Sequence, residues 1–355
     1  MTQNAPDPEN SDDGPSEPVP ARFPSPGTRR CQRCGALNGL DFDTCIRCVE
    51  PLAEPRAQAQ PAAPRWPPEP AGVLERPWAA KFILGLTFLT FVGQVMVTYL
   101  RGDRFPIPFL TGFHDIDLMR FGAMPVDLGA VAREPWLLLS CVFVHAGVLH
   151  IGLNMMGFMS FARISEPAVG PSRLFLAYVV TGLAGSAATI ALSSFDAPGF
   201  LGILQRLISA QPRGVPYITT TLGASGAVFG MMGLVLGWLL RRRDSRWKTF
   251  AMEAVLFSVL FGFAVNASPR STIVINNAAH IGGLLAGIVF GFVYAGGRRW
   301  APPWLVNGGA AFCVLACIGS LILAQLSPRW RMVDQTLTSL PEGLPSDSTV
   351  TAPNR

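Results

Sequence analysis

The chain has 355 residues, of which 50% are hydrophobic and only 14% are charged, and its mean hydropathy is +0.35. A soluble domain of ordinary composition is rarely so apolar, which excludes a typical water-soluble enzyme and predicts an all-α protein that crosses a membrane several times. The formal net charge of +5 comes largely from arginines grouped at the ends of apolar runs. We interpret this charge as a topology signal, and we expect no nucleic-acid partner.

Two polar, proline-rich stretches lie in the first part of the chain. Residues 1–30 are rich in Pro, Ser, Asp and Glu, so they have too little apolar surface to offset the entropy of ordering and are expected to be disordered. Their acidic composition fits neither a cleavable signal peptide nor an arginine-rich transit peptide. Residues 49–77 are rich in Pro, Ala, Gln and Arg, which predicts a semi-extended linker.

Two Cys-x-x-Cys pairs occupy residues 31–48, between these stretches. Cys31 and Cys34 form the first pair, Cys45 and Cys48 form the second, and ten residues separate the pairs. Each pair can turn two thiolates toward one tetrahedral metal ion, and zinc is the natural occupant. We therefore predict a small structural zinc ribbon, similar to those of many prokaryotic proteins. Two disulfides or a redox-active pair are the alternatives.

Apolar segments of membrane-spanning length dominate residues 78–326, and they predict seven transmembrane helices. A long connection over residues 101–148 is too apolar for a free loop and too broken by Pro and Gly to span, so we place it at the outer membrane interface. The tail, residues 327–355, is expected to be disordered. The seven segments are Trp78 to Leu100, Leu149 to Ala162, Leu174 to Leu192, Ser225 to Leu240, Phe250 to Ala267, Ala278 to Ala295, and Trp304 to Leu326.

Basic residues set the predicted orientation. Arg241, Arg242, Arg243, Arg246 and Lys248 crowd the loop between the fourth and fifth segments, which the positive-inside rule places in the cytoplasm. The N-terminus and the ribbon then also lie in the cytoplasm, where thiols are kept reduced, which weakens the disulfide alternative. We expect a multi-pass protein of the bacterial cytoplasmic membrane, with the lipid bilayer as its surroundings.

Polar side chains inside membrane segments mark function by default, and here they gather toward the outer ends of three parallel segments. His150 and Asn154 lie in the second segment, Ser225 in the fourth and His280 in the sixth. At 1.5 Å per residue, Ser225 and His280 lie within about one helical turn of each other in depth. Small residues recur at steps of three or four beside both, which predicts close helix contact: Gly226, Gly230, Gly233 and Gly237, and Ala279, Gly283, Gly287 and Gly291.

A serine hydroxyl beside an imidazole can act as a nucleophile, because the imidazole accepts the proton that makes unaided attack difficult. The second, fourth and sixth segments contain no Asp or Glu, so we predict a Ser225–His280 dyad without a third, acidic member. His150 and Asn154 lie one turn apart on one helix face, and with the Ser225 backbone N–H they could stabilise an oxyanion. The alternatives are a packing serine and a histidine that only joins two helices.

At this point the sequence resembles the rhomboid family of intramembrane serine proteases over about residues 115–300. His145 to Asn154 is similar to the family's H-x-x-x-x-H-x-x-x-N, Gly223 to Gly226 matches G-x-S-G, and Ala279 to Gly287 matches A-H-x-x-G-x-x-x-G. In one departure, the family often has Glu-x-Trp-Arg ahead of the histidines, whereas this chain reads Glu134-Pro135-Trp136-Leu137.

The resemblance implies a six-helix core with an added seventh helix, and substrates that are single-span membrane proteins cut near the outer face. It also implies that Ser225 is the nucleophile, His280 the general base, and His150 and Asn154 the oxyanion donors. We expect that peptide hydrolysis needs no cofactor. An inactive relative that binds membrane clients is the alternative, but such proteins typically lack the serine or histidine. A transporter is disfavoured because the segments carry almost no acidic groups and no duplicated half.

Overall fold

The computed structural model describes residues 28–39, 42–52, 78–100, 113, 115–194, 198–199, 220–266, 275–296 and 301–338. Contacts within the chain divide it into two compact units, Met1–Arg65 and Trp66–Arg355. The predicted linker falls outside the described residues, except for its first four positions.

The smaller unit is a two-stranded hairpin followed by a second turn. Strand β1 (Thr28–Arg30) pairs antiparallel with β2 (Leu37–Gly39), and Thr44 forms an isolated bridge with Pro51. The ordered ribbon therefore extends beyond the predicted residues 31–48 on both sides. The prediction of disorder is wrong for Thr28–Arg30, because these residues obtain their backbone hydrogen bonds from β2.

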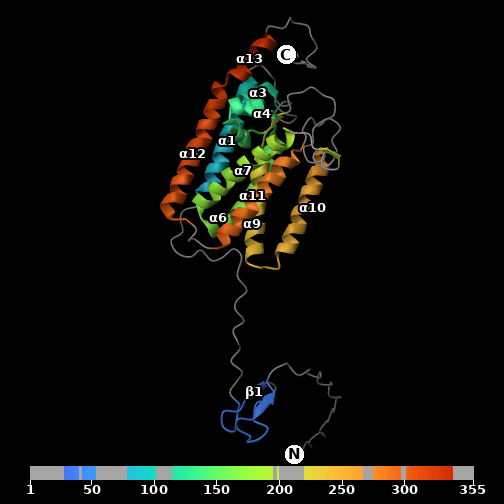
Figure 1. Ribbon diagram of the computed structural model, residues 1–355, viewed down its shortest axis with the longest axis vertical. Coiled ribbons are helices and arrows are strands. Elements are labelled where there is room, and N and C mark those ends of the chain that lie inside the picture. Colours follow the sequence, from blue (N-terminus) through green and yellow to red (C-terminus); the bar gives the residue numbers. More distant parts are fainter. Residues whose placement is uncertain are drawn as a thin grey trace, which may run out of the picture. The chain divides into compact units, whose positions relative to one another are not determined.

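The larger unit is a helical bundle in which apolar helices lie side by side (Figure 1). Short elements between α1 and α6 form a compact segment, which we call the external segment after its predicted side of the membrane. In chain order, the described elements of the whole larger unit are α1 (Ala79–Leu100), α3 (Asp115–Arg120), β3 (Met124–Pro125), α4 (Leu128–Arg133), α5 (Leu137–Ser140), the 3-10 helix η1 (Cys141–Phe143), α6 (Val148–Val169), α7 (Pro171–Ser193), β4 (Thr220–Thr221), α9 (Ser225–Arg241), α10 (Trp247–Asn266), α11 (Asn277–Ala295), α12 (Pro303–Leu326) and α13 (Pro328–Thr338).

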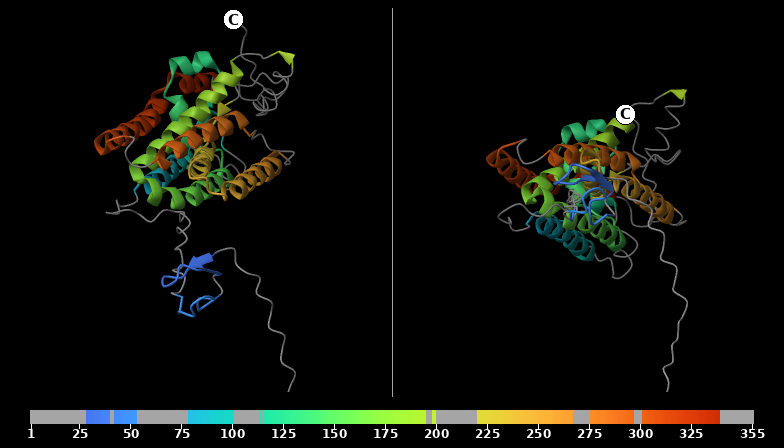
Figure 2. Two further views of the ribbon diagram at one scale, coloured as in Figure 1. Left: turned by 60° about the horizontal axis from the view of Figure 1, so that its bottom comes forward. Right: turned by 90° about the horizontal axis from the view of Figure 1, so that it is seen from below.

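Helices occupy all seven positions that hydropathy indicates. In the described part of the chain, four helical stretches are long and apolar enough to cross a membrane alone: Ala79–Leu100, Pro171–Ser193, Asn277–Ala295 and Pro303–Met332. Leu137–Phe143 and Val148–Val169 meet at 95° and could together form a fifth span. The chain is therefore an integral, multi-pass membrane protein. The views in Figure 2 show α12 and α10 on opposite flanks of the bundle.

The C-terminal prediction needs correction. Residues from 327 were expected to be disordered, but Pro328–Thr338 form α13, which follows α12 after a break at Ser327. Hydropathy misses this helix because its composition is polar, and its order comes from contacts with the external segment instead. The Trp330 ring, for example, lies 4.8 Å beneath the guanidinium of Arg120.

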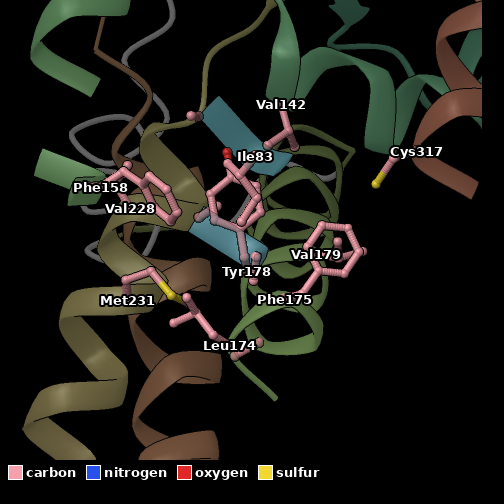
Figure 3. Close-up of a cluster of buried hydrophobic side chains, with 14 of the residues drawn as sticks. Ile83, Val142, Phe158, Leu174, Phe175, Tyr178, Val179, Val228, Met231 and Cys317 are labelled. Atoms are coloured by element: carbon pink, nitrogen blue, oxygen red, sulfur yellow. The ribbon is translucent and has the colours of Figure 1, made fainter. Parts of the chain in front are cut away.

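Tyr178 of α7 lies at the centre of the apolar core (Figure 3). Its ring contacts Phe158 of α6 edge-on at a centroid distance of 5.2 Å, and Phe143 of η1 at 6.4 Å. Ile83 of α1 and Met231 of α9 are fully buried in the same cluster. The core thus ties the external segment to four helices of the bundle.

Helices α9 and α11 meet along a seam of glycines. A Cβ atom added at Gly283 or Gly287 would overlap the carbonyl oxygen of Gly226 or Gly230, respectively. From the other side, a Cβ at Gly233 would overlap the carbonyl oxygen of Leu284. Backbone therefore lies directly on backbone, as the small-residue pattern predicts.

The seam predicts that Gly287→Ala destabilises the fold although alanine favours helices. The added methyl group must push α9 and α11 apart, at a cost of about 1–3 kcal/mol for overpacking. Thermal unfolding of the purified protein in detergent should therefore begin at a lower temperature. Gly319→Ala in α12 is the matched control, since nothing lies within 4 Å of a Cβ there. Equal melting of both variants would contradict the seam.

Candidate functional site

The Ser225 hydroxyl lies 2.8 Å from His280 Nε2, which is hydrogen-bonding distance. Ser225 is the first residue of α9, and His280 lies in the first turn of α11. The glycine seam begins directly below both residues and brings the two helix ends together. His280 is buried at 8% exposure, while Ser225 is partly accessible.

Phe229 fixes the plane of the His280 ring. The two rings are stacked, with centroids 4.2 Å apart and an interplanar angle of 5°. Phe229 lies one turn below Ser225 on the same face of α9, so one helix face both contacts the imidazole edge and supports its flat side. Sequence analysis missed this residue, although its spacing of four from Ser225 was a usable signal.

Asn276 holds the start of α11 in place, and sequence analysis missed it too. Its side-chain oxygen accepts from the Ala279 amide at 3.1 Å and so caps the helix. Its amide nitrogen donates to the hydroxyls of Thr189 at 2.9 Å and Thr221 at 2.8 Å. Within the described part of the chain, no carboxylate hydrogen-bonds to His280.

His150 lies against Gly223, two residues before Ser225. Its Nδ1 accepts a hydrogen bond from the Ala146 amide at 3.2 Å, so the proton of the neutral ring resides on Nε2. Gly223 has a φ of +109°, and a Cβ there would lie 2.8 Å from His150 Nε2. Only glycine fits this conformation and this space together.

Asn154 is placed differently from His150. Its side-chain nitrogen donates to the His150 carbonyl oxygen at 2.9 Å, one turn back on α6, and the residue is 6% exposed. This bond uses one of its two N–H groups and leaves the other free for a further acceptor. Among the described contacts, Asn154 makes no hydrogen bond to α9.

His145 holds the backbone just before the serine. Its Nε2 accepts from the Ala224 amide at 3.3 Å, and its Nδ1 lies 3.2 Å from the Phe143 carbonyl oxygen. The side chain of the buried Gln94 of α1 makes two hydrogen bonds to the His145 backbone: it donates to the carbonyl at 2.9 Å and accepts from the amide at 3.3 Å. The Gly223 amide donates a second hydrogen bond from this stretch of backbone, to the Cys141 carbonyl at 2.8 Å.

The four ribbon cysteines gather at one point in the smaller unit. Their sulfur atoms all lie within 4.8 Å of one another, with 3.6 Å between Cys31 and Cys48 and 3.5 Å between Cys34 and Cys45. None is in a disulfide. Four thiolates around one tetrahedral zinc ion would lie about 3.8 Å apart, given Zn–S distances of about 2.3 Å, so the cluster fits a metal ion.

Hydrogen bonds support this cluster from the surrounding backbone. Burial acts to raise the pKa of the Cys45 thiol, but hydrogen bonds from the Arg47 amide and its neighbours outweigh burial and lower the pKa to about 6. The buried Asn38 joins the two turns, because its side-chain oxygen accepts from the Ile46 amide at 2.8 Å. For Cys45 these groups thus favour the thiolate form that a metal requires. At Cys48 a hydrogen bond from the Glu50 backbone is outweighed by burial and the neighbouring thiols, which raise the pKa to about 12.

Comparison with known proteins identifies a rhomboid domain over residues 132–297. The chain is 30% identical over 186 residues to RHOMBOID-like protein 1 of Arabidopsis thaliana, covering 52% of this chain and 41% of that protein. It is 29% identical over 255 residues to RHOMBOID-like protein 5 of the same plant, covering 64% of this chain and 73% of that protein. Rhomboid protease GluP of Bacillus subtilis is 30% identical over 173 residues, covering 48% of this chain but only 28% of that protein.

The close contact at Gly223 predicts that Gly223→Ala disturbs the site. The side chain would be strained at this φ and would also displace the His150 ring. We expect faster amide hydrogen exchange in residues 222–226, measured by mass spectrometry. Gly152→Ala on α6 is the control, because it meets no atom within 4 Å. Unchanged exchange in Gly223→Ala would show that the glycine is dispensable.

Proposed function

Because the chain belongs to the rhomboid family, we propose that it is an intramembrane serine protease that uses Ser225 as nucleophile and His280 as general base. The observation that carries this proposal is the 2.8 Å contact between the Ser225 hydroxyl and His280 Nε2. As an apolar, multi-pass protein, the chain would take other transmembrane proteins as substrates. Single-span proteins, cut near the outer face, fit a site at the helix ends.

The reaction would proceed by proton transfer between two side chains. As the Ser225 hydroxyl attacks the substrate carbonyl carbon, its proton moves to His280 Nε2, which then gives it to the departing amine. A water molecule, activated by the same imidazole, would hydrolyse the acyl-enzyme. The stacked Phe229 ring keeps the imidazole in plane throughout, which is needed because no acid orients it in the described residues.

Three groups could stabilise the oxyanion that forms during attack. The Ser225 backbone N–H lies at the first position of α9, where the helix supplies no acceptor for it. The Nε2–H of His150 lies beside Gly223, and the second N–H of Asn154 lies one turn away. Donors fixed before the reaction are worth about 3–4 kcal/mol each in other serine proteases.

We also propose an orientation for the protein. The basic residues Arg241, Arg242 and Arg243 follow the far end of α9 from Ser225, and Arg241 and Arg242 lie over the rings of Phe292 and Trp238. Such residues favour the cytoplasmic side, which would place the N-terminus inside and the site near the outer face. The bacterial cytoplasmic membrane stays a prediction.

Replacing either member of the pair tests the protease proposal. We expect the purified protein to cleave a model transmembrane substrate, and Ser225→Ala and His280→Ala to reduce the rate on the order of 10³-fold or more. Ser160→Ala is the matched control, because in the described part of the chain that hydroxyl bonds only to the Met156 carbonyl of its own helix. Equal rates of cleavage for all variants would end the proposal, and no cleavage by wild type would favour a client-binding role.

For the ribbon, we propose a structural zinc ion held by Cys31, Cys34, Cys45 and Cys48, with no part in hydrolysis. Metal analysis of the full chain should find about one zinc per protein, and Cys34→Ser should lose most of it, since a structural site needs all four ligands. Cys313→Ser in α12 should keep the full complement. Folded protein without metal would refute the zinc site.

A further inference from the structure

A buried carboxylate outside the site has its partners at the other end of the chain. Glu134, between α4 and α5, is only 7% exposed. The Ser327 hydroxyl donates to its Oε1, and an Arg329 guanidinium nitrogen lies 3.2 Å from its Oε2. The Arg329 amide in turn donates to the Ser327 hydroxyl at 3.2 Å. The junction of α12 and α13 thus neutralises a charge in the external segment.

The same junction holds α3 through a second set of contacts. The Gln325 side chain donates to the Arg120 carbonyl at 3.1 Å and accepts from the Arg120 guanidinium at 3.2 Å. The Trp330 indole donates to the Gln325 carbonyl at 3.2 Å, and its ring lies under Arg120. The external segment is therefore fastened at two points by residues 325–330.

The segment that Glu134 begins leads directly to the serine. It continues through α5 and η1, whose Cys141 carbonyl accepts the Gly223 amide at 2.8 Å. Two residues beyond η1, His145 accepts the Ala224 amide at 3.3 Å. The backbone amides of the two residues before Ser225 thus donate to the segment that the C-terminal junction holds in place.

We propose that Ser327 and Arg329 are positioning residues for the reaction at Ser225, acting through Glu134 and the segment that follows it. The proposal rests on the protease function proposed above. A buried carboxylate that loses its cation must be solvated, so the start of α5 would move toward water. That shift would loosen the bonds from Cys141 and His145 to the loop before the serine. A small displacement of the reacting groups is enough to slow catalysis strongly.

The experiment compares Arg329→Gln with the double variant Glu134→Gln, Arg329→Gln in the full chain. In the single variant we expect faster amide exchange at residues 222–226 and a fall in kcat on the order of 10- to 100-fold, with little change in KM. The double variant should return both quantities toward wild type, because no charge is left unpaired. Arg331→Gln, an exposed residue on the same helix, should behave as wild type in both assays.

Unchanged exchange in Arg329→Gln, or a double variant as impaired as the single one, would overturn the proposal. Ser327→Ala, which keeps the ion pair, covers the case in which Arg329→Gln does not fold. It should give a smaller rise in exchange at the same residues, and no rise would also overturn the proposal. If wild type cleaves no substrate, the protease function fails, yet the exchange measurements still decide whether the junction holds the loop.

Discussion

The contact of backbone on backbone between α9 and α11 is the constraint on which the site depends. Helices that meet through ordinary side chains lie about 8–10 Å apart, too far for a serine and a histidine at their ends to meet reliably. Here Gly283 and Gly287 lie against carbonyl groups of α9, and no side chain separates the two helices at these two positions. The hydrogen bond from Ser225 to His280 is thus a consequence of the seam below it.

The helices and the Ser225–His280 contact could be predicted because their signals are local. Hydropathy locates each helix to within a few residues at most ends, and glycines at steps of three and four point to the seam. The similar depth of Ser225 and His280 in the membrane follows from the rise per residue, since both residues lie in the first turn of their helices. The catalytic roles of these residues, by contrast, remain proposals that geometry supports.

The contacts that hold the site in place could not be predicted, because they join residues far apart in the sequence. Nothing near Asn276 indicates that it bonds to Thr221, or that β3 pairs with β4. Leu137 stands where the rhomboid family often has an arginine, so another group must hold the external segment. In the structure Leu137 is 1% exposed in the apolar core, and the cation beside Glu134 is Arg329, from a tail whose polar composition suggested disorder.

Helices α6, α9 and α11 all begin at the site, and this common direction has an electrostatic consequence. Each helix carries a macrodipole equivalent to about half a positive charge at its N-terminus. Three such ends converge near Ser225, so peptide groups alone give this region a positive potential. A lysine or arginine would supply the same field only at a high desolvation cost in an apolar bundle. The fold can therefore stabilise an anion within the membrane without burying a cation.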